Sequence, residues 1–199
     1  LMALEFAISY PKYVNKIISI SSSYKLSTIQ LLHNLEQAYI LDLAKDSNIR
    51  KEEYLSLARM VAHKTYISLD LLAERARGES KYIDNEMGYF LNTPQESYMM
   101  HQGEKFIERF TMDSYRTIIN AWQNFKLNEK ELKKVKEKEV LIISIDSDVC
   151  FYPEEQTELV NVLNLNNANV SYHLLHSDKG HDAFLLEPDI FFEPISSYL

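Results

Sequence analysis

Residues 140–156 read VLIISIDSDVCFYPEEQ, and residues 169–187 read NVSYHLLHSDKGHDAFLLE. In the first stretch, the β-branched run from Val140 to Ile145 predicts a buried strand of the kind found in parallel sheets. In the second stretch, Val170 to His176 predicts another strand, and the segment from Pro153 to Leu163 between them predicts a helix. A strand, a helix and a strand in this order form a crossover, so we expect the two strands to be parallel.

An aspartate and a histidine are expected at one edge of this sheet. The first strand breaks at Asp146-Ser147-Asp148, and the second leads into a loop in which Gly180 precedes His181. Both Asp148 and His181 therefore follow the carboxyl end of a parallel strand. In open α/β sheets this is the edge at which ligands bind.

The order of these two residues indicates a catalytic pair. In α/β hydrolases the catalytic triad runs Ser, Asp, His along the chain, and Asp148 and His181 fit its last two members. The carboxylate holds one tautomer of the imidazole, and the other ring nitrogen takes the proton of the nucleophile. The nucleophile itself is missing from this stretch.

Other interpretations of these residues compete with the triad. Asp148 suits the N-cap of the following helix, and His181 suits a solvated loop position. A metal site made of His173, His176, Asp178 and His181 is a third interpretation. We reject the metal site, because residues three apart on a strand point to opposite faces of the sheet.

The composition favours one globular domain with a substantial core and argues against nucleic acid as a ligand. The chain has 199 residues, of which 46% are hydrophobic and 12% aromatic. Its 21 Lys and Arg against 29 Asp and Glu give a net charge of −8. Phosphate backbones require a basic surface, which this balance does not supply.

Cys150 is the single cysteine, so an internal disulfide is excluded, and no apolar run approaches the length of a membrane span. We therefore expect a cytoplasmic protein that does not bind membranes. Cys150 stands two residues after Asp148, and we interpret it as small apolar filler and not as a nucleophile.

The remaining chain predicts a strand near the start and a long helical block. Residues 1–9 predict a helix that ends before Pro11, and Val14 to Ser21 predicts a strand. Residues 78–88 predict a loop, and residues 128–139 a solvated helix or linker. Helical periodicity then predicts these further helices: Thr28–Ala44, Lys51–Ala62, Ser68–Arg77, Pro94–Phe110, Asp113–Phe125 and, interrupted by Pro194, Pro188–Leu199.

This order of elements predicts the C-terminal part of a doubly wound α/β fold with a large helical insertion. We expect residues 1–23 and 129–199 to form the α/β core, and residues 24–128 to form a helical lid. An insertion that follows a strand is well placed to cover the ligand-binding edge.

The chain resembles homoserine O-acetyltransferases, which have the α/β-hydrolase fold, over essentially its whole length. Five stretches carry the resemblance: LMALEFAISYP, ARMVAHKTYIS, ESYMMHQGEKFIERFTMDSYRTIINA, IDSDVCFYPEEQ and GHDAFLLE. In that family the nucleophilic serine lies on a G-G-S-x-G-G elbow, which by this match would fall ahead of Leu1. By this match we expect the serine and the first oxyanion-hole donor upstream of residues 1–199, and we expect these residues alone to be inactive.

The resemblance implies a role for five residues. Asp148 and His181 match the acid and base of the triad, and Arg59 and Tyr66 match a pair that binds homoserine. Asp182 matches the acid that receives the amino group of homoserine. This set suits a zwitterion, because Arg binds a carboxylate in a bidentate manner and Asp takes a cation. From the residues alone, Arg59 also suits a helix-surface ion pair, Tyr66 a core position and Asp182 a helix cap.

The resemblance implies ping-pong transfer of an acetyl group from acetyl-CoA to the hydroxyl of homoserine, a step of methionine biosynthesis. Acetyl-CoA is then a co-substrate, and neither a cofactor nor a metal is expected. Family members are typically homodimers joined through the lid helices. Two alternatives stay open, an esterase or other hydrolase of the same fold and a non-catalytic truncated remnant that serves as an interaction domain. The sequence does not distinguish acetyl from succinyl donors, or homoserine from serine acceptors.

Overall fold

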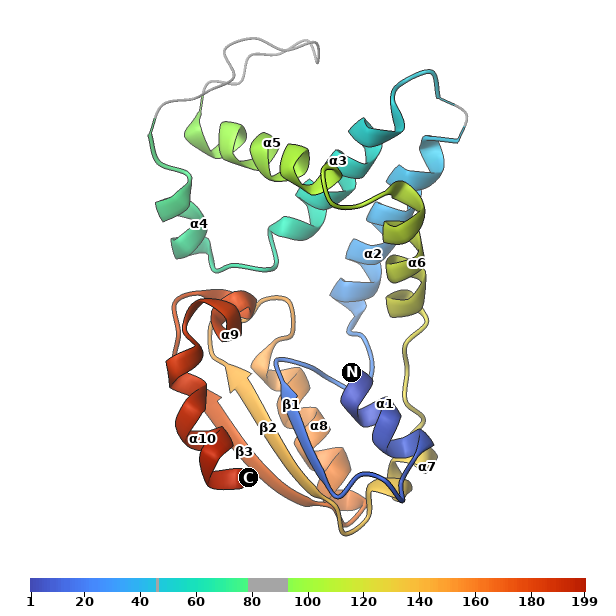
Figure 1. Ribbon diagram of the computed structural model, residues 1–199, viewed down its shortest axis with the longest axis vertical. Helices are drawn as coiled ribbons and strands as arrows, with labels where there is room; N and C mark the ends of the chain where they lie inside the picture. The colour runs from blue at the N-terminus through green and yellow to red at the C-terminus, as the bar shows by residue number, and fades with distance from the viewer. Residues whose placement is uncertain (46, 79–92) are drawn as a thin grey trace. The chain divides into compact units, whose positions relative to one another are not determined.

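Figure 1 shows the computed structural model of the chain, which describes residues 1–45, 47–78 and 93–199. The predicted loop at residues 78–88 lies, apart from Gly78, outside the described residues. Two compact units are present. The first, which we call the α/β unit, consists of Leu1–Ser27, Thr65–Ser68 and Phe125–Leu199, and the second, the helical unit, lies within Thr28–Lys64 and Leu69–Asn124.

A parallel sheet of three strands forms the centre of the α/β unit (Figure 1). Its order is β1 (Lys16–Ile20), β2 (Glu139–Ile145) and β3 (Asn169–Leu175), with β2 in the middle. Ile17 is in register with Val140, and Val140 with Val170. The sequence prediction of parallel strands joined by crossovers is confirmed, with strand limits shifted by one or two residues.

The middle strand is buried on both faces, as its uninterrupted apolar run predicts. Val140 and Ile142 pack in one core cluster with residues of α1 (Met2–Ser9) and α8 (Pro153–Leu165). Leu141, Ile143 and Ile145 pack in a second cluster with Ala183 and Phe191. Successive side chains of a strand point to opposite faces, so helices are needed on both sides of the sheet.

Short helices complete the α/β unit. They are α7 (Glu129–Leu132) with the 3₁₀ turn Lys133–Val135, the 3₁₀ turn Gly180–Asp182 followed by α9 (Ala183–Leu186), and the turn Pro188–Phe191 followed by α10 (Phe192–Tyr198). Pro194 lies in the first turn of α10, where the backbone N–H groups have no partner within the helix. Its presence is therefore compatible with a helix at this position.

The helical unit contains α2 (Thr28–Leu43), α3 (Lys51–His63), α4 (Leu69–Arg75), α5 (Pro94–Ile107) and α6 (Met112–Gln123). Two of these helices begin with reciprocal capping boxes, Thr93 with Glu96 and Thr111 with Ser114. A cluster that includes Leu41, Leu55, Phe106, Tyr115 and Ile119 forms the core of this unit. The strong start signals explain why the predicted helix limits agree with the structure to within a few residues.

The polarity of α2 is reversed relative to that of an ordinary surface helix. Three of its four buried residues are the polar Gln30, Asn34 and Gln37. Large apolar side chains are exposed instead, at Ile29, Leu31, Leu32, Leu35, Tyr39 and Leu43. Leu31, Leu35, Tyr39 and Leu43 follow each other at intervals of four residues, which places them on one side of the helix. We call these four residues the α2 stripe.

Candidate active site

Asp148 occupies a tight turn directly after β2. Its backbone N–H donates to the carbonyl of Ile145 at 3.1 Å, and its side chain is fully buried. The carboxylate oxygen Oδ1 accepts hydrogen bonds from the backbone N–H groups of Cys150 and Phe151 at 2.8 and 2.9 Å. These bonds fix the carboxylate, while the N-cap of α8 is Tyr152 and not Asp148.

His181 lies in the 3₁₀ turn that follows β3. Gly180 precedes it with a φ of +74°, a backbone conformation that favours glycine. A Cβ atom at Gly180 would lie 2.5 Å from the backbone nitrogen of Ser68. The turn is thus packed directly against the backbone of the segment Thr65–Ser68, which belongs to the same unit.

The two predicted residues meet in a short hydrogen bond. His181 Nδ1 lies 2.9 Å from Asp148 Oδ2, and the imidazole is 19% exposed. An ionised carboxylate only accepts hydrogen bonds, so Nδ1 carries the proton and Nε2 is left as an acceptor. A partly exposed imidazole with an acceptor nitrogen at Nε2 and a buried carboxylate at Nδ1 is an arrangement that can remove a proton from a nucleophile.

Aromatic rings and a buried thiol surround the imidazole. The ring of Phe151 lies 5.7 Å from that of His181, and the ring of Phe184 lies 5.8 Å away in an edge-on orientation. Burial raises the pKa of the Cys150 thiol to about 12, and the nearby Asp148 carboxylate adds to this. The thiol therefore stays protonated near neutral pH, which supports its interpretation as filler and not as a nucleophile.

A second Asp–His pair lies beside the first one. His176 Nδ1 is 2.5 Å from Asp146 Oδ2, and the His176 side chain is 90% exposed. The hydrogen bond to Asp146 raises the pKa of His176. Burial raises the pKa of Asp146, but the hydrogen bonds from His176 and Ser177 outweigh burial, so the pKa is lowered overall. Solvent screens this pair, whereas the Asp148–His181 pair is enclosed.

Tyr66 and Asp182 are neighbours within the α/β unit. The backbone N–H of Asp182 donates to the carbonyl of Tyr66 at 2.9 Å, and both residues are half-buried. The structure therefore brings two of the three predicted substrate-binding residues next to His181. Binding of homoserine by Tyr66 and Asp182 stays a prediction.

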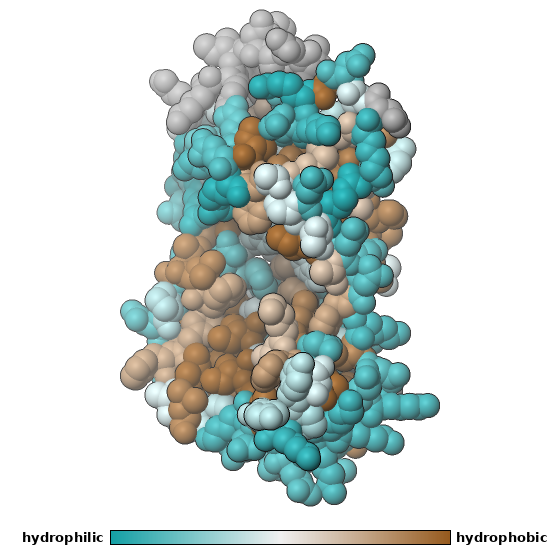
Figure 2. Space-filling model, turned by 45° about the vertical axis from the view of Figure 1, so that its right-hand side comes forward, coloured by the Kyte–Doolittle hydropathy of each residue, from teal (hydrophilic) through white to brown (hydrophobic). Residues whose placement is uncertain are grey.

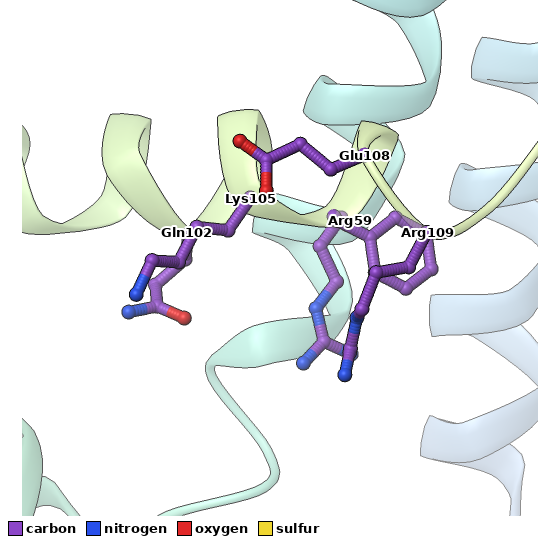
Figure 3. A pocket seen from close by; sticks show the side chains of 6 residues that line it. Arg59, Gln102, Lys105, Glu108 and Arg109 are labelled. Carbon is purple, nitrogen blue, oxygen red and sulfur yellow. The ribbon is translucent and has the colours of Figure 1, made fainter.

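Arg59 lies on α3 in the helical unit and lines a cavity of about 300 Å³ with residues of α5 and of the turn that follows it (Figure 3). Its guanidinium group lies 4.9 Å from the centre of the Phe106 ring. The guanidinium groups of Arg59 and Arg109 point to the same side in Figure 3, and the carboxylate of Glu108 points away from them. Arg59 and His181 belong to different units, so their predicted convergence stays a prediction.

Several residues of the site were missed by reasoning from the sequence. Phe151 and Phe184 flank the imidazole, and the backbone of Ile67 and Ser68 packs against its turn. The hydroxyl of Ser147, described below, links the two loops that carry Asp148 and His181. Only Ser147 had a signal in the sequence, since it lies beside the predicted acid.

Within residues 1–45, 47–78 and 93–199, no group of three or more His, Cys, Asp or Glu side chains is arranged to hold a metal ion. In the same part of the chain, no helix is both long enough and apolar enough to cross a membrane.

Comparison with known proteins identifies relatives over nearly all of the chain. Homoserine O-acetyltransferase of Methanosalsum zhilinae is 36% identical over 202 aligned residues, which cover 94% of this chain and 40% of the relative. Homoserine O-succinyltransferase of Neisseria gonorrhoeae is 30% identical and is matched by 100% of this chain, over 56% of its own length. The chain thus spans about half the length of these relatives. No protein-family model matches it.

Solved structures show the same fold. The crystal structure of homoserine O-acetyltransferase from Bacillus anthracis matches 99% of this chain with a TM-score of 0.85 at 16% identity. Esterase E22 matches 98% with a TM-score of 0.84 at 14% identity. The α/β-hydrolase fold predicted from the sequence is confirmed by these likenesses and by the parallel sheet with its flanking helices. On the strength of the sequence relatives, the chain belongs to the family of homoserine O-acyltransferases with the α/β-hydrolase fold.

Proposed function

We propose that the chain supplies the acid, the base and the acceptor site for transfer of an acetyl group from acetyl-CoA to the hydroxyl of L-homoserine. The observation that carries the proposal is the 2.9 Å contact between His181 Nδ1 and the buried carboxylate of Asp148. This contact leaves Nε2 as the atom that accepts a proton. The names of the relatives supply the substrate class.

In the proposed reaction, Nε2 of His181 takes the proton of a serine hydroxyl while the serine oxygen attacks the thioester carbon. The developing imidazolium is stabilised by Asp148, and its proton then passes to the departing CoA sulfur. In the second half, His181 takes the proton of the homoserine hydroxyl, which attacks the acyl-serine. Collapse of this intermediate returns the proton to the serine, so each half-reaction balances.

We place the serine on a segment that precedes Leu1 in the complete enzyme. The chain spans 40% to 56% of the length of its relatives, so these relatives contain residues that this chain does not match. Met2 and Phe6 of α1, and Tyr10 directly after it, are more than half exposed. Figure 2 shows hydrophobic side chains gathered on the face of the molecule that it presents. In an α/β fold, an apolar helix surface of this kind is suited to pack against further elements of the chain.

For the acceptor, we assign the carboxylate of homoserine to Arg59 and its amino group to Asp182, and we also assign a substrate contact to Tyr66. Arg59, Lys105 and Arg109 around one cavity favour an anionic group there. Acetyl-CoA serves as co-substrate, and the proposal requires no further cofactor and no metal. We place the reaction in the cytoplasm, where the single free cysteine is compatible with reducing conditions.

We also propose that the complete protein is a homodimer joined through the lid, with the α2 stripe at the interface. An apolar stripe on an exposed helix, opposite buried polar residues, supports this assignment.

The experiment combines residues 1–199 with the elbow-bearing N-terminal segment of the Methanosalsum relative and follows release of free CoA thiol. We expect turnover with homoserine only when both parts are present, and a loss of about 10⁴-fold in Asp148→Asn, because the wrong imidazole tautomer is held. Asp146→Asn is the matched control and should keep full activity. Turnover by residues 1–199 alone, or thiol release that water supports as well as homoserine does, would contradict the proposal.

A further inference from the structure

Ser147 lies between the two aspartates that follow β2, one position before the buried acid. Its hydroxyl donates to the carbonyl of Ser177 and accepts a hydrogen bond from the backbone N–H of Gly180 at 3.0 Å. Gly180 is the residue before His181. One hydroxyl therefore joins the acid loop to the base loop, at positions adjacent to Asp148 and His181.

Other contacts between these loops lie nearer to the strands. The N–H of Asp146 donates to the carbonyl of Leu175 at 3.0 Å, and its carboxylate accepts from the N–H of Ser177 at 3.1 Å. These bonds continue the pairing of β2 with β3. The bond to Gly180 reaches further along the loop, as far as the residue that sets the position of the imidazole.

Gly180 is also held from a second direction. A Cβ atom at this position would lie 2.5 Å from the backbone nitrogen of Ser68 and 2.7 Å from the carbonyl carbon of Ile67, and the Ser68 hydroxyl donates to the carbonyl of Asp178 in the same loop. Ile67 is fully buried. The turn that carries His181 is thus enclosed by the Thr65–Ser68 backbone and by the hydroxyl of Ser147.

We propose that Ser147 is a positioning residue, whose hydroxyl fixes the His181 turn at hydrogen-bond distance from Asp148. Catalytic groups tolerate displacements of only about 0.5 Å from their productive positions. The backbone at a glycine is conformationally free, so the loop that contains Gly180 would move readily if its hydrogen bond to Ser147 were lost. The hydroxyl makes no contact with a reacting atom in this role, and it acts through the backbone of Gly180.

The test uses the full chain with ¹⁵N-labelled histidine and measures the exchange of the His181 Nδ1 proton with water by NMR. Ser147→Ala should raise this exchange rate about tenfold, the size expected for loss of one hydrogen bond. Ser147→Thr, which keeps the hydroxyl, should restore the slow exchange. Ser144→Ala is the matched control, because it removes a nearby buried hydroxyl of β2 that makes no hydrogen bond with the described residues.

The amide protons of Ile142 and Ile143 in β2 serve as the internal reference for overall stability. A specific role requires that their exchange stays unchanged in Ser147→Ala. The proposal is overturned by unchanged Nδ1 exchange in Ser147→Ala, by an equal rise in Ser144→Ala, or by a parallel rise at the β2 amides. This proposal rests on the proposed role of the Asp148–His181 pair. The exchange measurement needs no turnover, so its failure can be distinguished from failure of the acyl-transfer assay.

Discussion

Asp148 uses its two carboxylate oxygens for different tasks. One oxygen closes the turn by accepting from the N–H groups of Cys150 and Phe151, and the other accepts from His181. Reasoning from the sequence weighed an N-cap role for Asp148 against the triad. The structure has Tyr152 at the N-cap of α8, and Asp148 instead closes the turn ahead of the helix while it contacts His181, because a carboxylate has acceptor sites on both oxygens. The positions of Asp148 and His181 were predictable, since each lies in the loop that follows a predicted strand.

Arg59 provides a test of substrate binding in the reconstituted enzyme. Arg59→Lys should raise the KM for homoserine and leave formation of the acyl-serine unchanged, because a lysine cannot form the bidentate contact with a carboxylate. Loss of such a contact costs about 1.5 to 3 kcal/mol, or roughly 10- to 150-fold in kcat/KM. Steady-state kinetics measure the KM, and a single-turnover acetyl-CoA assay measures acylation.

Arg50→Lys is the matched control, since Arg50 is exposed, pairs with Glu53 and does not line this cavity. Equal homoserine kinetics in wild type and Arg59→Lys would refute the assignment of the carboxylate to Arg59.

His63 makes the stability of the helical unit depend on pH. It is 5% exposed, and its Nε2 lies 3.2 Å from the Tyr98 hydroxyl. Burial, with the positive charges of Arg59 and Arg75, lowers its pKa from 6.5 to about 4. The neutral form is favoured by folding, so this contribution is fully present above the unfolded pKa of about 6.5 and is lost as the pH falls toward 4.

We expect the free energy of unfolding to fall by on the order of 2 to 3 kcal/mol as His63 becomes protonated, and we expect this decrease to be absent in His63→Gln. Urea unfolding of both proteins at pH 7 and pH 5 measures it. His176→Gln is the comparison, because the raised pKa of His176 stabilises the fold at low pH and this contribution is lost as the pH rises. Identical pH dependence in wild type and His63→Gln would contradict the prediction.

At the scale of elements, caps and periodicity predicted most of the fold. The Thr93 and Thr111 boxes and the long apolar run of β2 are local signals, and the elements that carry them lie where the sequence placed them. The close packing of Gly180 against Ser68 had no such signal. It depends on two segments that are distant in sequence, and local patterns do not encode contacts of this kind.

Among the described residues, two glycines of positive φ, Gly78 and Gly180, allow packing to be separated from backbone strain. Gly180→Ala should destabilise the chain by about 3 kcal/mol or more, because a Cβ there meets the Ser68 backbone at 2.5 Å in addition to the cost of a positive φ. At Gly78, with a φ of +108°, a Cβ meets no atom of the described residues within 4 Å, so Gly78→Ala should cost only about 1 kcal/mol. Urea unfolding followed by circular dichroism compares the two, and equal losses would show that the contact with Ser68 is not close.

At the scale of the whole molecule, α2 provides a test of assembly. We expect Leu35→Asp, in the middle of the α2 stripe, to shift the protein from dimer to monomer, because a charge cannot be buried in an apolar interface without a partner. Sedimentation velocity measures the mass. Glu36→Gln, one position away on the same helix, is the control that should stay dimeric. A wild-type chain that is monomeric at all concentrations would contradict the proposed dimer.

The whole-molecule features were the least predictable. Apolar residues at the spacing of the α2 stripe predict a helix whether their side chains are buried or exposed. The sequence therefore predicts α2 but not the exposure of its apolar side. The nucleophile, too, came from the resemblance and not from any pattern in residues 1–199.

The segment Thr65–Ser68 belongs to the α/β unit, although residues on both sides of it belong to the helical unit. The chain therefore passes from one unit to the other at four places and not at two. A shortened protein in which Ser27 is joined to Phe125 would lose the backbone that packs on Gly180 and the carbonyl that holds Asp182. The helical insertion is thus not a removable module, and any change in its length between α3 and α4 acts directly on the turn that carries His181.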